Sequence, residues 1–336
     1  MTIATNAAQT PATEQTAPRR HRAARVVDWL SRYSAISTTA LLLVLAAVLT
    51  PSFYDGGNLR TVILQTSALG IVVLGQTVVL LVRGIDMSVS AIVAITGVAA
   101  ASNKGGESLW LTLGLVILIG IVVGVVNGLL ITWRKVPPFI ATFIVFIVAS
   151  GGLLAYTRGQ TSGSAPAWLR NLGSGSISGL PLPFIVWIVM GAVLLFVLKR
   201  TIWGRHVYSV GAAPEASRHA GVPVALVTLS AYVLCALCAV VGGLVYSGYL
   251  GYVDRNLGTN INLNSIAAAI VGGVAFSGGR GSVVGAAVGA VLLTVLTNIV
   301  VVANLPIYWQ LIAQGMVLIF AVTISGLRDR WARNLP

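Results

Sequence analysis

The sequence predicts an all-α integral membrane protein of about ten transmembrane helices, with broken or re-entrant elements and both termini in the cytoplasm. Of its 336 residues, 57% are hydrophobic and only 9% are charged, whereas an ordinary soluble domain has roughly 25% charged residues. Several apolar runs reach the roughly 20 residues that a helix needs to cross a bilayer. These runs do not alternate as the strands of an outer-membrane barrel do. A helical membrane bundle is therefore expected.

The apolar runs predict ten spanning segments. They cover residues 35–52, 60–82, 85–102, 109–133, 137–157, 184–198, 222–247, 263–277, 283–303 and 307–326. The segment at 184–198 is short for a span and could begin at Leu180. An even number of spans places both termini on the same side of the membrane.

The distribution of Lys and Arg indicates which side that is. In this arrangement sixteen of the 21 basic residues lie on the side shared by the termini, and five lie on the other. Cytoplasmic loops carry an excess of Lys and Arg, so both termini are expected to be cytoplasmic. An odd number of spans would place one terminus outside, and the basic C-terminal tail argues against that.

The segments outside the predicted spans differ in composition. Residues 1–34 are polar and end in an arginine-rich stretch, which predicts a disordered basic cytoplasmic tail, with a targeting role as the alternative. Residues 35–327 would form the transmembrane domain, and residues 328–336 a second basic tail. Within the domain, residues 158–183 are rich in Gly and Ser and predict a periplasmic loop. Residues 199–221 are basic and predict a cytoplasmic segment.

The net charge of +13 does not indicate nucleic-acid binding. The basic residues sit at the ends of apolar runs, and they do not gather into a patch with interleaved aromatic residues. The two cysteines, Cys235 and Cys238, lie three residues apart inside an apolar run. A metal or redox pair is conceivable there, but no third ligand is near, so small core residues are the preferred interpretation.

Glycines recur every fourth residue in two apolar runs. One stripe comprises Gly120, Gly124 and Gly128, and the other Gly281, Gly285 and Gly289. Small residues at this spacing let helix backbones approach closely in lipid. The stripes predict tight helix packing, with a subunit interface or a moving seam as the alternative.

Groups that would supply energy are missing from this sequence. None of the three lysines follows a glycine, so the phosphate-binding loop of an ATPase is absent. Of the eight acidic residues, only Asp86 lies at the edge of a spanning run, whereas ion-coupled carriers usually need ionisable groups inside the membrane. We therefore expect no cofactor or metal in this chain. If ATP drives this protein, another chain must bind it.

Asp86 belongs to the segment VRGIDMSVSAIVAITG, in which Gly84 interrupts an apolar run. Asp86 and Ser88 supply capping groups for the helix that follows. A helix cap at a tight turn is one interpretation. The other is a broken-helix element that lines a substrate path, because polar backbone at membrane depth is tolerated where it is buried or lines a cavity.

A second segment repeats this pattern. Gly84 to Val89 and Gly278 to Val283 share the frame G-x-x-x-S-V, and each opens a helix rich in small residues. Interrupted segments at matching places in two halves of a chain point to a transport path.

The cytoplasmic segment contains the stretch GAAPEASRHAGVP. Pro214 suits the first turn of a short helix, Glu215 suits its positive end, and Gly221 and Pro223 stop it. The segment predicts a short amphipathic helix parallel to the membrane. It is interpreted either as an interfacial helix without a partner or as a docking element for a cytoplasmic motor.

Together these segments resemble the permeases of bacterial ATP-binding-cassette importers of the ribose, xylose, arabinose and galactose type. The resemblance covers roughly residues 40–327. It rests on an ordered set of motifs: Gly84–Val89, Gly124–Gly128 with Asn127, Val136–Thr142, Gly204-Arg205 with Tyr208, Gly211–Gly221, Ser277–Ser282 and Trp309-Gln310. The family usually reads G-G-I-D-L-S-V-G, and here Arg83, Met87 and Ser90 replace three of those positions. The family's Gly-Asn before the docking helix is altered at Ala212-Ala213.

The resemblance implies a transport subunit without covalent chemistry, located in the bacterial inner membrane. Its implied partners are a cytoplasmic ATPase, a periplasmic or lipid-anchored sugar-binding protein and a second permease copy, most simply an identical one. The implied pathway or gate residues are Gly84, Asp86, Ser88, Asn127, Ser277, Gly278, Arg280 and Ser282. The implied ATPase-coupling residues are Gly204, Arg205, Gly211, Glu215, Ala216 and Gly221.

Other functions are weighed against this one. A nucleoside or branched-chain amino-acid permease is the nearest alternative, and an ion-coupled secondary carrier is a more distant one. A membrane enzyme is disfavoured because the three histidines all fall in predicted cytoplasmic segments. The apolar runs show no distinctive set of polar residues along a pathway, so the sequence does not identify the sugar.

Overall fold

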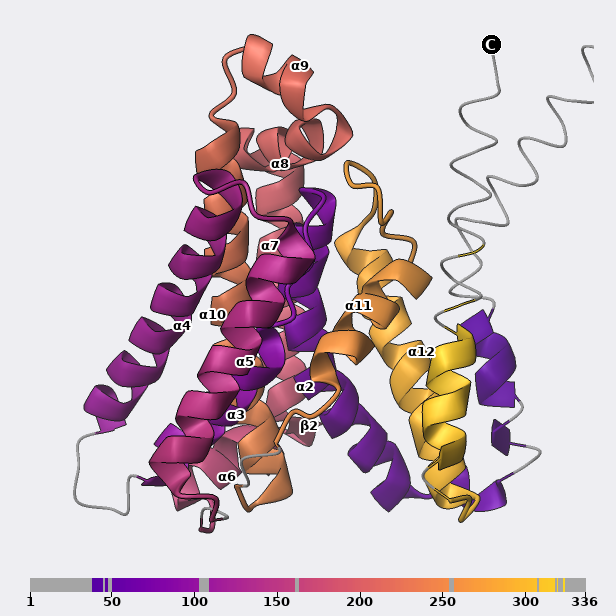
Figure 1. Ribbon diagram of the computed structural model, residues 1–336. Coiled ribbons are helices and arrows are strands. Elements are labelled where there is room, and N and C mark those ends of the chain that lie inside the picture. Colours follow the sequence, from indigo (N-terminus) through magenta and orange to yellow (C-terminus); the bar gives the residue numbers. More distant parts are fainter. Residues whose placement is uncertain are drawn as a thin grey trace, which may run out of the picture. The chain divides into compact units, whose positions relative to one another are not determined.

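A computed structural model describes residues 38–317 with short gaps at 45, 48–49, 103–108, 161–162, 254–256 and 307, together with residues 319 and 323. The two tails predicted at 1–34 and 328–336 lie outside the described residues. The described part is almost entirely helical, and Figure 1 shows its helices running between two ends of a bundle.

Long apolar helices dominate the bundle. Six are long and apolar enough to cross a membrane among the residues that the structure describes: α2 (Gly56–Leu81), α4 (Leu109–Thr132), α5 (Pro138–Thr157), α7 (Leu182–Arg200), α10 (Val224–Leu250) and α12 (Val283–Val302). Two shorter apolar helices, α3 (Val89–Ser102) and α11 (Ile261–Val271), lie among them. Residues 38–44 and 308–317 are also helical. The prediction of an all-α membrane protein is thereby confirmed.

Two predicted spans differ from the helices that form. The span predicted at 85–102 begins as a helix only at Val89, and the span predicted at 263–277 ends as a helix at Val271. Hydropathy extends these spans beyond the helices because, apart from Asp86, the non-helical residues next to them are also apolar or small. Gly273 adopts a left-handed backbone (φ 87°), which ends α11. The predicted spans at 35–52 and 307–326 lie partly outside the described residues.

Short elements cap both ends of the bundle (Figure 1). One end holds α8 (Ile202–Ala212) and α9 (Pro214–His219), which fill the predicted cytoplasmic segment. The other end holds α6 (Ala167–Ser174) and the antiparallel strands β1 (Ser176–Ile177) and β2 (Leu180–Pro181). A short 3-10 helix, η1 (Pro51–Tyr54), precedes α2. The predicted loop at 158–183 is thus partly ordered into a helix and a hairpin.

Helices α2 and α10 form the centre of the bundle. Both have apolar side chains on all sides over most of their length, and α10 packs against α2, α3, α4 and α6. A helix that is hydrophobic all round belongs in a core or a membrane. By contrast α4, α5 and α7 expose many large apolar side chains, among them Trp110, Ile147 and Phe196. Lipid tails accept such surfaces without the penalty that water would impose.

The glycine stripes pack helices together within the chain. A Cβ added at Gly124 or Gly128 would press against the α10 backbone at Val233 or Leu229, with nearest atoms 2.6 and 2.9 Å away. Gly289 lies against the Ala268 carbonyl of α11, and Gly285 lies against the carbonyl of Gly272, which directly follows α11. The tight-packing interpretation of both stripes is confirmed, because small residues let these backbones meet.

The two cysteines lie in the core of α10. Both are free thiols, and both are almost completely buried. Their environment is that of small core residues, as the preferred interpretation expects.

Candidate functional site

The break between α2 and α3 is fastened by a buried polar cluster. One oxygen of Asp86, Oδ1, accepts hydrogen bonds from the Ser88 backbone N–H (2.8 Å) and from the Ser88 hydroxyl (2.6 Å). The carboxamide of Asn127 on α4 donates to the Ser88 Oγ (2.9 Å). All three side chains are completely buried. Asp86, Ser88 and Asn127, which the sequence analysis selected, are therefore brought together.

The backbone of the same break is held by three further helices. The Gln76 carboxamide of α2, oriented to pair donors with acceptors, bonds both the N–H (3.1 Å) and the carbonyl (3.2 Å) of Asp86. The Thr142 hydroxyl of α5 accepts from the Met87 N–H (3.1 Å), and the Tyr232 hydroxyl of α10 donates to the Ile85 carbonyl (3.4 Å). Backbone at membrane depth needs such partners because no water reaches it. The cluster thus matches the capping interpretation of Asp86.

Three segments that are distant in sequence meet at the end of the bundle that carries α8 and α9. We call the contact of Leu81–Gly84, Gly211–Ala212 and Ser277–Gly281 the seal. The Gly279 N–H donates to the Leu81 carbonyl (2.9 Å), and the Tyr208 hydroxyl donates to the Gly281 carbonyl (3.0 Å). Burial raises the pKa of Tyr208, so the hydroxyl remains a neutral donor at physiological pH.

Glycine residues allow the three segments of the seal to approach one another closely. A Cβ at Gly211 would collide with the Leu81 carbonyl oxygen, and a Cβ at Gly279 would lie 2.5 Å from the Ala212 nitrogen. Gly278 and Gly279 also need left-handed backbones (φ 81° and 70°), which side chains disfavour. Backbone therefore packs directly against backbone at the seal.

The two G-x-x-x-S-V segments occupy corresponding places. Ser88 directly precedes α3, and Ser282 directly precedes α12, where its hydroxyl accepts from the Gly285 N–H (3.0 Å). Gly278 lies against the side chain of Arg83, next to Gly84. Ser277 and Arg280 are exposed beside this contact. The repeat thus places two helix starts near one seal.

The predicted cytoplasmic segment at 199–221 contains the short helix that the sequence predicts. Pro214 occupies the first turn of α9, Glu215 lies in that turn, and Gly221 follows the end with φ 81°. Glu215 and Ala216 are exposed, and Glu215 pairs with Arg218 (3.0 Å) on the surface. Gly204 allows α8 to turn back against the Leu198 carbonyl at the end of α7, and Arg205 is exposed.

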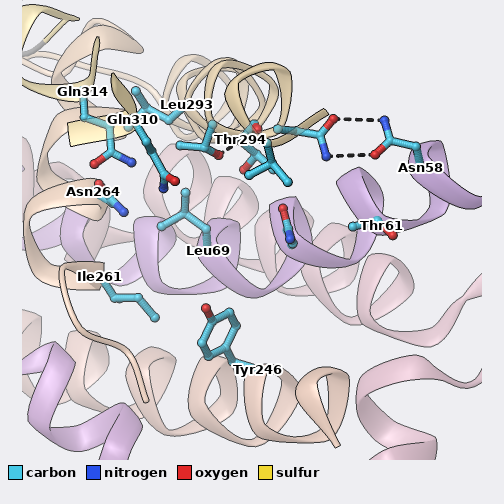
Figure 2. A pocket seen from close by; sticks show the side chains of 14 residues that line it. Asn58, Thr61, Leu69, Tyr246, Ile261, Asn264, Leu293, Thr294, Gln310 and Gln314 are labelled. Carbon is cyan, nitrogen blue, oxygen red and sulfur yellow. Dashed lines mark hydrogen bonds between the residues drawn. The ribbon is translucent and has the colours of Figure 1, made fainter. Parts of the chain in front are cut away.

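A separate cavity of about 320 Å³ opens among α2, α10, α11, α12 and the helix at 308–317 (Figure 2). Such a volume lies within the range of small-molecule sites. Fourteen residues line it: Asn58, Thr61, Gln65, Leu69, Tyr246, Ile261, Asn264, Leu293, Thr294, Thr297, Asn298, Val301, Gln310 and Gln314. Six of these carry carboxamides, four carry hydroxyls, and none carries a charge.

The carboxamides of the cavity fall into two groups. Asn58 and Asn298 bond each other reciprocally, at 2.9 and 3.0 Å, as the dashed lines of Figure 2 show. Gln65 donates to the Tyr249 hydroxyl (3.2 Å). Asn264, Gln310 and Gln314 gather on the opposite side of the view, and their side chains make no hydrogen bond to any described residue. These three carboxamides are available to a ligand.

None of the pathway residues implied by the resemblance lines this cavity, and its polar lining was not predicted from the sequence. One signal was present: Gln310 and Gln314 lie four residues apart, which places them on one helix face. The remaining polar residues come from four other helices, so only the fold brings them together.

Most of this chain is similar in sequence to known permease proteins. The model of the family described as branched-chain amino acid transport system / permease component matches residues 58–322. The ribose import permease protein RbsC of Escherichia coli (strain K12) is 31% identical over 309 residues, which cover 90% of this chain and 95% of that protein.

Two further relatives have similar coverage. The probable ABC transporter permease protein y4mJ of Sinorhizobium fredii is 34% identical over 89% of this chain and 90% of its own length. The autoinducer 2 import system permease protein LsrC of Escherichia coli O9:H4 is 30% identical over 88% of this chain and 89% of its own length. No solved structure matches the chain. The match over most of the chain shows that this protein belongs to the family of permease components of branched-chain amino acid transport systems.

Proposed function

We propose that this chain is the transmembrane subunit of an ATP-driven importer that moves a monosaccharide or related polyol across the inner membrane by alternating access. The observation that carries the proposal is the uncharged cavity lined by carboxamides and hydroxyls. A carboxamide both donates and accepts hydrogen bonds, as sugar hydroxyls do. The relatives named for ribose and autoinducer 2 import support the same substrate class.

The chemistry of the cavity separates this proposal from its nearest alternative. A branched-chain amino acid is a zwitterion, and both of its charges would need partners at membrane depth. The described lining offers no charged side chain. A nucleoside permease stays an alternative because a nucleoside is also uncharged, and an ion-coupled carrier is disfavoured because Asp86 is the only buried carboxylate among the described residues.

The positions of cavity and seal support alternating access. Both lie along α2, with Leu69 at the cavity and Leu81 at the seal, and twelve residues of helix span about 18 Å. We place α8, α9 and the seal on the cytoplasmic side, because Arg83, Arg205, Arg218 and Arg280 gather there. The cavity then faces the periplasmic half, and the chain is closed toward the cytoplasm.

The same orientation completes the membrane arrangement that we propose. Ten spans place both termini in the cytoplasm, with 35–327 as the transmembrane domain and the tails at 1–34 and 328–336 on the cytoplasmic side. Residues 158–183 face the periplasm, where a periplasmic or lipid-anchored binding protein delivers the sugar. A second copy of the permease completes the pathway.

A cytoplasmic ATPase, which binds ATP and Mg²⁺, is proposed to dock on α9. Its cycle would bias the inward- and outward-facing states, because a ligand shifts such an equilibrium only through different affinities for the two states. The test is a tagged pull-down from mild-detergent membranes, followed by mass spectrometry and by a ligand screen of any binding protein found. An ATPase and a sugar-binding partner are the expected result. Recovery of the chain without an ATPase would contradict the proposal.

Charge reversal at Glu215 is expected to uncouple transport. Glu215 is exposed on α9, and its pairing with Arg218 contributes at most about 1 kcal/mol to stability. The variant Glu215→Lys should therefore insert at normal levels but lose the ATPase in the pull-down and lose uptake. Arg134→Ala, a charge change in the loop between α4 and α5, serves as the control. Normal ATPase recovery with Glu215→Lys would refute the docking assignment.

The free carboxamides of the cavity are expected to bind substrate. Gln314→Leu keeps the size of the side chain and removes its hydrogen bonds, so uptake should fall about fivefold if one bond worth about 1 kcal/mol is lost. The measurement is uptake of radiolabelled D-ribose, D-xylose, L-arabinose and D-galactose, normalised to inserted protein. Gln160→Leu, at an exposed residue outside the cavity, is the matched control. Equal uptake by the two variants for every sugar would remove Gln314 from the site.

A further inference from the structure

We propose that Arg83 is a positioning residue that joins the end of α8, which leads into the proposed docking helix α9, to the other segments of the seal. In this role it keeps the chain closed toward the cytoplasm. The inference rests on the proposed function for its meaning in transport. Its structural basis is independent of the cavity, because it depends on the contacts of one side chain at the opposite end of α2.

The guanidinium of Arg83 bonds the end of α8. Its Nε donates to the Gly211 carbonyl, and its Nη2 donates to the Ala212 carbonyl at 2.6 Å. Helix α8 ends at Ala212, and the last carbonyls of a helix lack partners within the helix. A cation at this negative end is also favoured by the helix dipole. Arg83 therefore caps α8 from a different segment of the chain.

The backbone of Arg83 indicates that the side chain has a purpose. Arg83 adopts a left-handed conformation (φ 65°), which is uncommon for residues with a side chain. Glycine would fit this backbone with less strain. No carboxylate of the described residues pairs with Arg83, so the two carbonyls are its described charge-stabilising partners. A strained position with a specific side-chain role is characteristic of a mechanical or functional site.

The bonds of Arg83 connect both sides of the seal. Ala212 lies two residues before Pro214, the first residue of α9. On the other side, Arg83 directly precedes Gly84 and the buried cluster around Asp86, and its side chain also lies against Gly278. A displacement of α9 by a docked ATPase would thus act on the Arg83 bonds first. Breaking them would release α2, α8 and the loop at 277–281 from one another.

The first test measures the seal in the permease without its partners. A single cysteine replaces Val274, which is buried beneath Gly281, in a Cys235→Ala, Cys238→Ala background. Inside-out vesicles are treated with a membrane-impermeant maleimide. Arg83→Ala should label at least about tenfold faster than Arg134→Ala, since the loss of even one of its two charge-assisted bonds shifts an equilibrium by about that factor. Arg83→Lys keeps the charge but cannot donate two hydrogen bonds in the same geometry, so its labelling rate should lie between those of Arg83→Ala and Arg134→Ala.

The second test measures coupling in the complex with the co-purified ATPase. Arg83→Ala should raise the ATP hydrolysed per sugar imported, which a purely structural loss of folded protein would not change. Labelling of Arg83→Ala at the rate of Arg134→Ala would overturn the proposal. If Arg83→Ala does not insert into the membrane, labelling of Arg83→Lys at the rate of Arg134→Ala would overturn the proposal. Faster labelling of Arg83→Ala, with no ATPase recovered in the complex, would support the positioning role of Arg83 and refute the importer function instead.

Discussion

Gly211→Ala is expected to impair sugar uptake strongly while the protein remains in the membrane. The added Cβ would collide with the Leu81 carbonyl oxygen and lie 2.5 Å from the Gly279 nitrogen, so α8 must move away from α2 and from the loop at 277–281. These neighbours are backbone atoms, which cannot rotate aside as a flexible side chain can. Arg83 would lose its carbonyl partners on α8 at the same time. We expect at least about a fivefold loss of uptake, corresponding to a strain of about 1–3 kcal/mol or more.

The measurement is uptake per inserted molecule, with ATP hydrolysis by the complex recorded alongside. Gly151→Ala on α5 is the matched control, because a Cβ there meets nothing within 4 Å. In a helix, alanine is favoured over glycine by about 1 kcal/mol, so the control should insert and transport normally. Uptake by Gly211→Ala at the control level would show that the close contact is not required.

Asp86→Ala is expected to cause a comparable loss, but through assembly of the membrane domain. The substitution removes the acceptor for two hydrogen bonds from Ser88 and leaves that buried N–H without its partner. The hydroxyl of Ser88, which also holds Asn127, loses its fixed orientation. Bonds to a charged acceptor are worth about 1.5–3 kcal/mol each, so destabilisation of about 3 kcal/mol or more is expected.

The variant Asp86→Asn distinguishes the effect of the capping hydrogen bonds of Asp86 from the effect of its negative charge. Only Oδ1 of Asp86 accepts hydrogen bonds, and asparagine retains an oxygen at that place. The asparagine variant loses the attraction between a carboxylate and the start of α3, about 0.3–1 kcal/mol. Its amide NH2 group takes the place of Oδ2, which has no hydrogen-bond partner among the described residues, at a cost of about 1–3 kcal/mol. It should therefore give folded protein in mild detergent at a yield between those of the wild type and Asp86→Ala, as judged by size-exclusion chromatography. Uptake per folded molecule distinguishes the two interpretations of Asp86: a change in yield alone supports the cap, and a loss of uptake in well-folded Asp86→Asn supports the pathway.

Much of the fold could be predicted because a helix that crosses a bilayer leaves a clear pattern of apolar residues in the sequence. Hydropathy placed α4, α5, α7 and α12 to within two residues at both their starts and their ends, since a helix in a bilayer needs a long apolar run. The short helix α9 was also predictable, because Pro214, Glu215 and Gly221 act on their own backbone. The point where α11 ends was not predictable, because the residues on both sides of Val271 are equally small and apolar.

The candidate site likewise has a part that could be predicted from the sequence and a part that could not. Asp86 and Ser88 could be selected from the sequence because a cap is a contact between residues two positions apart. The seal and the cavity could not, since Arg83 meets Gly211 across 128 residues and Asn58 meets Asn298 across 240. Glycines and carboxamides also have no signature of their own, because their role depends on what lies opposite them.

The sequence alone thus determined the membrane environment, the helical class, the short helix of the cytoplasmic segment and the resemblance to importer permeases. These properties follow from apolar length, charge distribution and local capping, each of which a single segment carries. Only the tertiary structure decided which glycines form the seal, which carboxamides remain free for a ligand and that Arg83 joins α8 to the break after α2. Such contacts depend on backbones that approach within hydrogen-bond distance from distant parts of the chain, and packing determines that approach.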